Sequence, residues 1–129
     1  TWVYLPDANV IATGDTMNNL KRYQSIDFNN GGDVRGAIRA TEAFLKVAND
    51  NTKIVVGHGP LATRADIVEF RDMLLTSRDR IEKLVNEGKT EQEVLAMKPL
   101  ADLDAKWAPG NDQLATNHVR NVYNSFKRL

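Results

Sequence analysis

Two residues able to bind a metal follow apolar segments of this sequence, at the point where each segment ends. Residues 10–13 lead through a glycine into Asp15, and residues 54–56 lead through another glycine into His58. Valine and isoleucine favour buried strands, and a glycine beside the next side chain leaves it uncrowded. A carboxylate and an imidazole are ligands of zinc-like metals, so Asp15 and His58 are the candidate metal ligands.

The elements that must position these residues are two strands of one predicted sheet. Residues 1–5 and 10–13 are rich in strand formers and flank turn residues, which predicts an antiparallel hairpin. Residues 33–48 repeat apolar side chains at helical spacing, and Asp33 is suited to cap that helix. Residues 53–56 then form the next predicted strand.

A strand, a helix and a second strand in one sheet form a parallel, right-handed crossover. The carboxyl ends of its two strands lie at the same edge of the sheet, where ligands bind in open α/β folds. The sequence therefore predicts an α/β fold in which Asp15 and His58 are neighbours across a crevice.

The segment after Asp15, residues 16–32, is polar and long for a loop in a compact domain. Loops at this edge of a sheet often build sites, so one interpretation makes the segment a substrate-side loop. Its candidate substrate contacts are then Asn18, Tyr23 and Asp27. The alternative interpretation is an ordinary surface loop, which Tyr23 helps to fold back onto the body.

The second half of the chain is predicted to be helical. Residues 100–111 are the exception, because they are expected to be irregular and anchored by Trp107. His118 lies among apolar residues of the last helix, so we expect it to be a packing or surface residue. Helical spacing, with Thr-x-x-Asp and Thr-x-x-Glu capping boxes before the first two, predicts helices over residues 64–87, 90–98 and 114–126.

The composition excludes several classes of function. The chain has 129 residues, with 17 basic and 17 acidic side chains, so a zero net charge gives no sign of a nucleic-acid partner or an anionic membrane. No apolar stretch is long enough to span a bilayer. The chain has no cysteine, which excludes thiolate metal sites and cysteine nucleophiles but leaves the cellular compartment open.

Four short motifs follow one another in the first half of the chain. They are Trp-Val-Tyr-Leu-Pro at residues 2–6, Thr-Gly-Asp at 13–15, Gly-Gly at 31–32 and Gly-His-Gly-Pro at 57–60. In order and spacing they resemble the carboxyl-terminal half of a metallo-β-lactamase-superfamily hydrolase. The resemblance implies half of an αββα sandwich, made of a β-hairpin, a βαβ crossover and carboxyl-terminal helices.

The resemblance also implies roles for the two candidate ligands. Asp15 corresponds to the aspartate that bridges two zinc ions, and His58 corresponds to the last metal-binding histidine. In that family a metal-bound hydroxide is the nucleophile, because coordination lowers the pKa of water to about 7. The family's His-x-His-x-Asp-His motif does not occur in these residues.

We therefore expect residues 1–129 to be a single partial domain, the carboxyl-terminal fragment of a zinc-dependent hydrolase of small molecules. It should be inactive alone and bind zinc weakly or not at all, since a catalytic zinc needs about three protein ligands. The alternative is a non-catalytic α/β assembly or binding domain, in which Asp15 and His58 are remnants of a metal site.

A half-sandwich would lack the sheet that covers its inner face. Exposed apolar sheet surface and open edge strands find partners, so we expect a homodimer or a larger assembly. The side chains expected to be short of cover are Val3, Leu5, Ile11, Ile54 and Val56.

Overall fold

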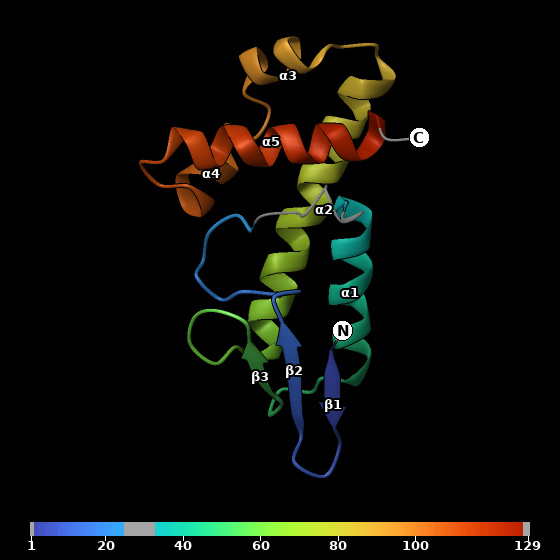
Figure 1. The fold of residues 1–129 in the computed structure, drawn as a ribbon, viewed down its shortest axis with the longest axis vertical. Coiled ribbons are helices and arrows are strands. Elements are labelled where there is room, and N and C mark those ends of the chain that lie inside the picture. Colours follow the sequence, from blue (N-terminus) through green and yellow to red (C-terminus); the bar gives the residue numbers. More distant parts are fainter. Residues whose placement is uncertain (1, 25–32, 128–129) are drawn as a thin grey trace.

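The computed structural model describes residues 2–24 and 33–127, which fold into five helices and a three-stranded sheet (Figure 1). The α/β class predicted from the sequence is therefore confirmed. In chain order the elements are β1 (Val3–Leu5), β2 (Val10–Gly14), α1 (Val34–Val47), β3 (Lys53–Val56), α2 (Arg64–Asn86), α3 (Glu91–Met97), α4 (Ala101–Trp107) and α5 (Asp112–Lys127).

The sheet has the order β1-β2-β3 and mixes both kinds of pairing. β1 and β2 are antiparallel, with Tyr4 opposite Ile11, which confirms the predicted hairpin. β2 and β3 are parallel, with Ile11 beside Ile54, which confirms the crossover through α1. The outer edge of β3 is partly paired, because Ile54 exchanges two backbone hydrogen bonds with Ala62.

The two faces of the sheet differ in their cover. Side chains alternate along a strand, so one face carries Ile11, Thr13 and Ile54, and all three are fully buried. The other face carries Val3 and Leu5, each 50% exposed, and Val55, 44% exposed. The expectation that Ile11 and Ile54 lack cover is therefore wrong, whereas it is confirmed for Val3 and Leu5.

The strand register explains this difference. Val3 pairs with Ala12 and Ala12 pairs with Val55, so these residues share the open face. The neighbouring positions turn to the helices, and a shift of one residue would exchange the two sets.

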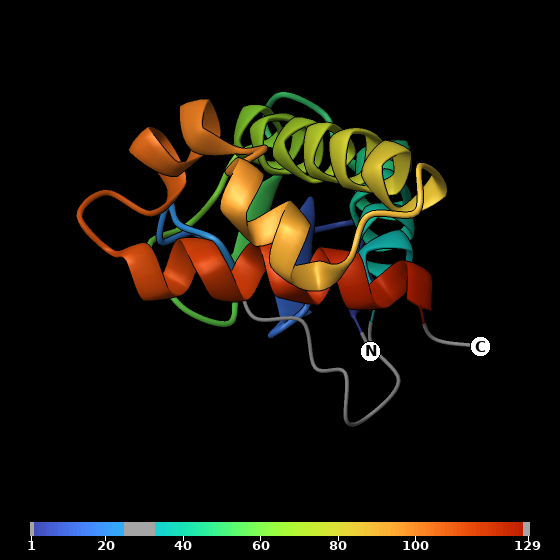
Figure 2. The same ribbon diagram turned by 90° about the horizontal axis from the view of Figure 1, so that it is seen from above.

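The helices form the rest of the core. α1 and α2 lie side by side, and α5 runs across them at the end away from the hairpin turn (Figures 1 and 2). The buried face of α1 includes Ile38 and Phe44, and that of α2 includes Ile67 and Ile81. None of the helices within residues 2–24 and 33–127 has the length and apolar character needed to cross a membrane.

The starts predicted for α1, α2 and α3 are confirmed by their caps. Asp33 accepts a hydrogen bond from the backbone N–H of Gly36 at 2.9 Å. Thr63 with Asp66, and Thr90 with Glu93, form reciprocal capping boxes at the starts of α2 and α3. Each such cap satisfies backbone N–H groups that have no partner within the helix.

One segment expected to be irregular is helical. α4 covers Ala101–Trp107. The residue before it, Leu100, and its last residue, Trp107, both have buried side chains. Its acidic first turn and the basic Lys106 in its last turn suit the helix dipole, and Asp102 pairs with Arg80 of α2. Seven residues give too short an apolar pattern to be detected, although Trp107 is the buried anchor that the sequence predicts.

Candidate metal site at the carboxyl edge of the sheet

Asp15 and His58 follow β2 and β3 at the same edge of the sheet, as the parallel crossover requires. The Nε2 atom of His58 lies 3.4 Å from the Oδ1 atom of Asp15. The side chains are 65% and 81% exposed, respectively. The prediction that these two residues are neighbours is confirmed.

The distance of 3.4 Å is long for a hydrogen bond between nitrogen and oxygen. It suits two ligands of one ion, because tetrahedral zinc with bonds of about 2.0–2.2 Å holds its ligand atoms about 3.4 Å apart. The two side chains thus have the spacing of a ligand pair without a rearrangement of the backbone.

Backbone hydrogen bonds fasten the two loops that carry these residues. The N–H of Gly57 donates to the carbonyl of Met17 at 3.1 Å, and the N–H of Asn19 donates to the carbonyl of His58 at 2.8 Å. The side chain of Met17 is buried beneath them. The spacing of Asp15 and His58 is therefore built into the contact between their loops.

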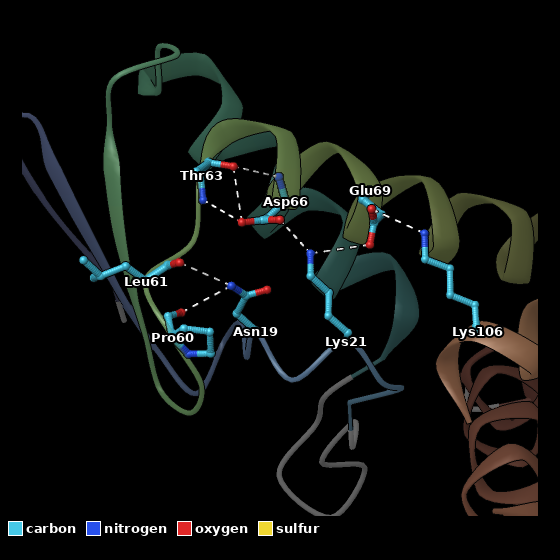
Figure 3. A network of polar contacts seen from close by, with 8 residues as sticks. All are labelled: Asn19, Lys21, Pro60, Leu61, Thr63, Asp66, Glu69 and Lys106. Atoms are coloured by element: carbon cyan, nitrogen blue, oxygen red, sulfur yellow. Dashed lines mark hydrogen bonds and ion pairs between the residues drawn. The ribbon is translucent and has the colours of Figure 1, made fainter. Parts of the chain in front are cut away.

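Asn19 adds a side-chain clamp to this contact. Its Nδ2 donates to the carbonyls of Pro60 at 3.3 Å and Leu61 at 3.4 Å, and the residue is only 7% exposed (Figure 3). Sequence reasoning missed this role. In the sequence Asn19 is one asparagine in a polar segment. Without knowledge of the carbonyls that it binds, it cannot be distinguished from an ordinary loop residue.

Lys21 holds the same loop against α2. Its Nζ lies 2.6 Å from Asp66 and 3.5 Å from Glu69, and Lys106 of α4 reaches Glu69 at 3.3 Å (Figure 3). Partial burial opposes ionisation of Asp66, but hydrogen bonds from Lys21 and Thr63 outweigh it and lower the pKa of this carboxyl. Asp66 therefore both caps α2 and anchors the loop.

Gln24 braces the turn that presents Asp15. Its Nε2 donates to the backbone carbonyl of Asp15 at 2.6 Å, and its Oε1 accepts the N–H of Asn18 at 2.8 Å. One side chain thus joins both ends of the four-residue turn. No short motif marks this residue, so the sequence does not identify it.

Gly57 leaves the space that this arrangement needs. A Cβ atom at this position would lie 2.3 Å from Oδ1 of Asp15, 2.8 Å from the carbonyl oxygen of Gly14 and 3.0 Å from Oδ1 of Asn18. Any side chain would therefore push Asp15 and Asn18 away. The Oδ1 atom of Asn18 is itself buried and has no hydrogen-bond partner among the described residues.

A pocket of about 490 Å³ opens in front of these groups, between the sheet edge and the start of α5. Its volume is that of a small-molecule site. Its charged groups are the carboxylate of Asp15 and the guanidinium of Arg22. The full lining is Asp15, Asn18, Leu20, Arg22, Tyr23, Gln24, His58, Asn111 and Leu114.

The three predicted substrate-side residues have different positions. Asn18 lines the pocket, and Asp27 lies outside the described residues. Tyr23 also borders the pocket, but it is only 3% exposed and its hydroxyl donates to Asp104 at 2.6 Å. Burial and this hydrogen bond raise the pKa of Tyr23.

His118 is a packing residue, as the sequence predicts. Its ring stacks on Tyr23 with 3.9 Å between centroids, and its Nε2 lies 3.0 Å from the hydroxyl of Ser77. It is only 3% exposed, and this burial lowers its pKa to about 3. Within residues 2–24 and 33–127, no group of three or more His, Cys, Asp or Glu side chains is placed to hold a metal ion.

Comparison with known proteins identifies no relative of this chain. The sequence matches no protein-family model, and no characterised protein matches it significantly. The relationship to the metallo-β-lactamase superfamily therefore stays a prediction from the four motifs.

Proposed function

We propose that this chain forms part of a zinc-dependent hydrolase of the metallo-β-lactamase superfamily and supplies two of its metal ligands, Asp15 and His58. The observation that carries the proposal is their separation of 3.4 Å at the carboxyl edge of two parallel strands. The pocket in front of them has room for a small-molecule substrate.

Two ligands do not make a catalytic zinc site, which uses about three protein ligands and an open position. On this proposal a His-x-His-x-Asp-His motif on a further segment provides the others, and that segment covers the open face of the sheet. The ion, when bound, would act as a Lewis acid and bring the pKa of its water to about 7. The 129 residues alone should not hydrolyse a β-lactam, a thioester or a lactone.

A zinc titration of the 129-residue protein tests this assignment. We expect weak binding that Asp15→Ala and His58→Ala both abolish. Asp7→Ala, which removes an exposed carboxylate in the turn between β1 and β2, should leave the binding unchanged. Binding that survives in both site variants would refute the assignment, and so would metal-dependent hydrolysis by the chain alone, which would require a complete site here.

The second candidate is a non-catalytic assembly or binding domain. The open face of the sheet favours it, because Val3, Leu5 and Val55 expose apolar surface beside the outer edge of β1, which pairs with no other strand of the described residues. A second copy of the chain placed on this face would give a homodimer. Light scattering should then show a dimer or larger species for the natural sequence and a monomer for Val55→Lys, and a monomeric natural protein would contradict it.

A further inference from the structure

Three oxygen atoms approach Gly57 in the space that a side chain there would occupy. Measured from the position of a Cβ on Gly57, Oδ1 of Asp15 lies at 2.3 Å, the carbonyl oxygen of Gly14 at 2.8 Å and Oδ1 of Asn18 at 3.0 Å. The same Oδ1 atom of Asp15 is the one that lies 3.4 Å from Nε2 of His58. The oxygen cluster and the pair of candidate ligands are therefore parts of one arrangement.

This arrangement brings negative charge together. Asp15 brings a negative charge, and the two other oxygens bring the negative ends of dipoles. Oδ1 of Asn18 is shielded from solvent and has no donor among the described residues. The carbonyl of Gly14 accepts a hydrogen bond from Oγ1 of Thr13 at 3.0 Å. Buried acceptors are normally satisfied, so the unsatisfied amide oxygen of Asn18 beside the carboxylate of Asp15 favours a cation in contact with both.

We infer that Asn18 is a third ligand of the metal ion held by Asp15 and His58, through its amide oxygen. The inference rests on the proposed function and extends it, because it assigns a ligand outside the family's histidine and aspartate set. Two oxygens and one imidazole nitrogen suit a divalent ion of the zinc type. Only one of the three ligands carries a charge, which explains why binding by this chain should be weak.

The local structure supports a ligand role for Asn18. Its backbone N–H is held by Gln24, and the following residue, Asn19, is fastened to the loop of His58. The backbone on both sides of the Asn18 side chain is therefore fixed relative to the loops of Asp15 and His58. Gly57 supplies the space in which the side chains of Asp15 and Asn18 approach.

A zinc titration of the full chain and its variants tests the inference. Asn18→Ala should weaken binding by about tenfold or more, and Asn18→Asp should strengthen it by about tenfold, because a carboxylate replaces a neutral amide. Asn111→Asp is the matched control. Asn111 lines the same pocket and accepts a hydrogen bond from Leu114, and aspartate caps a helix as well as asparagine does.

The control adds the same charge to the same pocket away from the oxygen cluster, so it should change affinity by less than about threefold. Thermal melting of each variant verifies that the fold is intact. If binding by the natural chain is too weak to measure, binding by Asn18→Asp that disappears on adding Asp15→Ala supports the inference.

The outcomes separate the two claims. If Asp15→Ala and His58→Ala abolish binding but the two Asn18 variants bind like the natural chain, the third ligand is refuted and the proposed function stands. If Asn111→Asp strengthens binding as much as Asn18→Asp does, the effect is one of charge alone and the third ligand is again refuted. If no variant binds zinc, including Asn18→Asp, the third ligand is refuted, because three ligands with two carboxylates should bind measurably. The proposed function is not refuted by that result, since in it a further segment completes the site.

Discussion

The two histidines of this protein lie in opposite environments. His58 is 65% exposed and its nearest charged neighbour is a carboxylate, at 3.4 Å. His118 is 3% exposed, stacks on the ring of Tyr23 and contacts the neutral hydroxyl of Ser77. An imidazole beside a carboxylate at an open edge can bind an ion, whereas a buried imidazole without a charged partner is held neutral.

The surroundings of the two histidines, and not their residue type, therefore determine their roles. His118 has one ring nitrogen, Nδ1, that is buried without a partner in the described part of the chain. His118 is nevertheless no candidate metal ligand, because its ring contacts an aromatic ring and a hydroxyl and has no carboxylate beside it among the described residues. If the roles differ in this way, changes in the core should lower the stability of the fold, and changes at the sheet edge should mainly lower the affinity for zinc.

The largest effect is expected from removing the buried ring. His118→Ala should lower the free energy of unfolding by about 3 kcal/mol, because it leaves a cavity beside Tyr23 and removes the contact with Ser77. His58→Ala should change it by less than about 0.5 kcal/mol, since an exposed side chain buries little surface. Urea denaturation measures both, and equal losses would erase the distinction between the histidines.

The next effect is a loss of stability in mild acid. The pKa of His118 is about 3 in the folded protein and about 6.5 when unfolded, so the folded state resists protonation. Its contribution is fully present above about pH 6.5 and falls as the pH decreases toward 3, which amounts to a loss of about 2 kcal/mol at about pH 5. Denaturation at about pH 7 and pH 5 measures it.

His118→Gln should remove this pH dependence, and His58→Gln should leave it in place. The carboxyl groups with lowered pKa values lose their contributions only as the pH falls below about 5, so they do not account for a loss between about pH 7 and pH 5. These groups are Asp33, Asp66, Glu93 and Asp102. A pH dependence that persists in His118→Gln would assign it to another group.

A methyl group at the sheet edge should have a smaller effect on stability. Gly57→Ala would bring a Cβ to 2.3 Å from Oδ1 of Asp15, so the loops must separate at a cost of about 1–2 kcal/mol. Zinc affinity should fall with it. Gly36→Ala is the matched control, because its Cβ meets nothing closer than 3.7 Å in α1 and alanine is the better helix former.

The smallest effect is expected from one hydroxyl. Tyr23→Phe removes the hydrogen bond to Asp104 and keeps the ring stacked on His118, so stability should fall by about 1 kcal/mol. Zinc binding should stay the same, because the hydroxyl is engaged by Asp104 of α4 and is not one of the proposed ligands. A double-mutant cycle with Asp104→Ala isolates this bond, and a coupling energy near zero would contradict its contribution.

Local patterns account for the parts of the fold that could be predicted from the sequence. Capping boxes such as Thr63 with Asp66 involve residues three positions apart, so their geometry follows from the helix itself. The hairpin and crossover follow from the order of strands and helix, and this order is enough to place Asp15 beside His58. These relations need no knowledge of distant contacts.

The remaining features depend on residues that are far apart in the chain. Tyr23 meets Asp104 across 81 positions, and Ser77 meets His118 across 41, so neither pair leaves a periodic pattern. The open face of the sheet depends on register, which turned Ile11 and Ile54 inward and Val55 outward. The order of the elements along the chain thus determined that Asp15 and His58 meet at one edge of the sheet. The clamp by Asn19, the buried oxygen of Asn18 and the neutral His118 arise only from tertiary packing, because burial and partner atoms are properties of the folded chain.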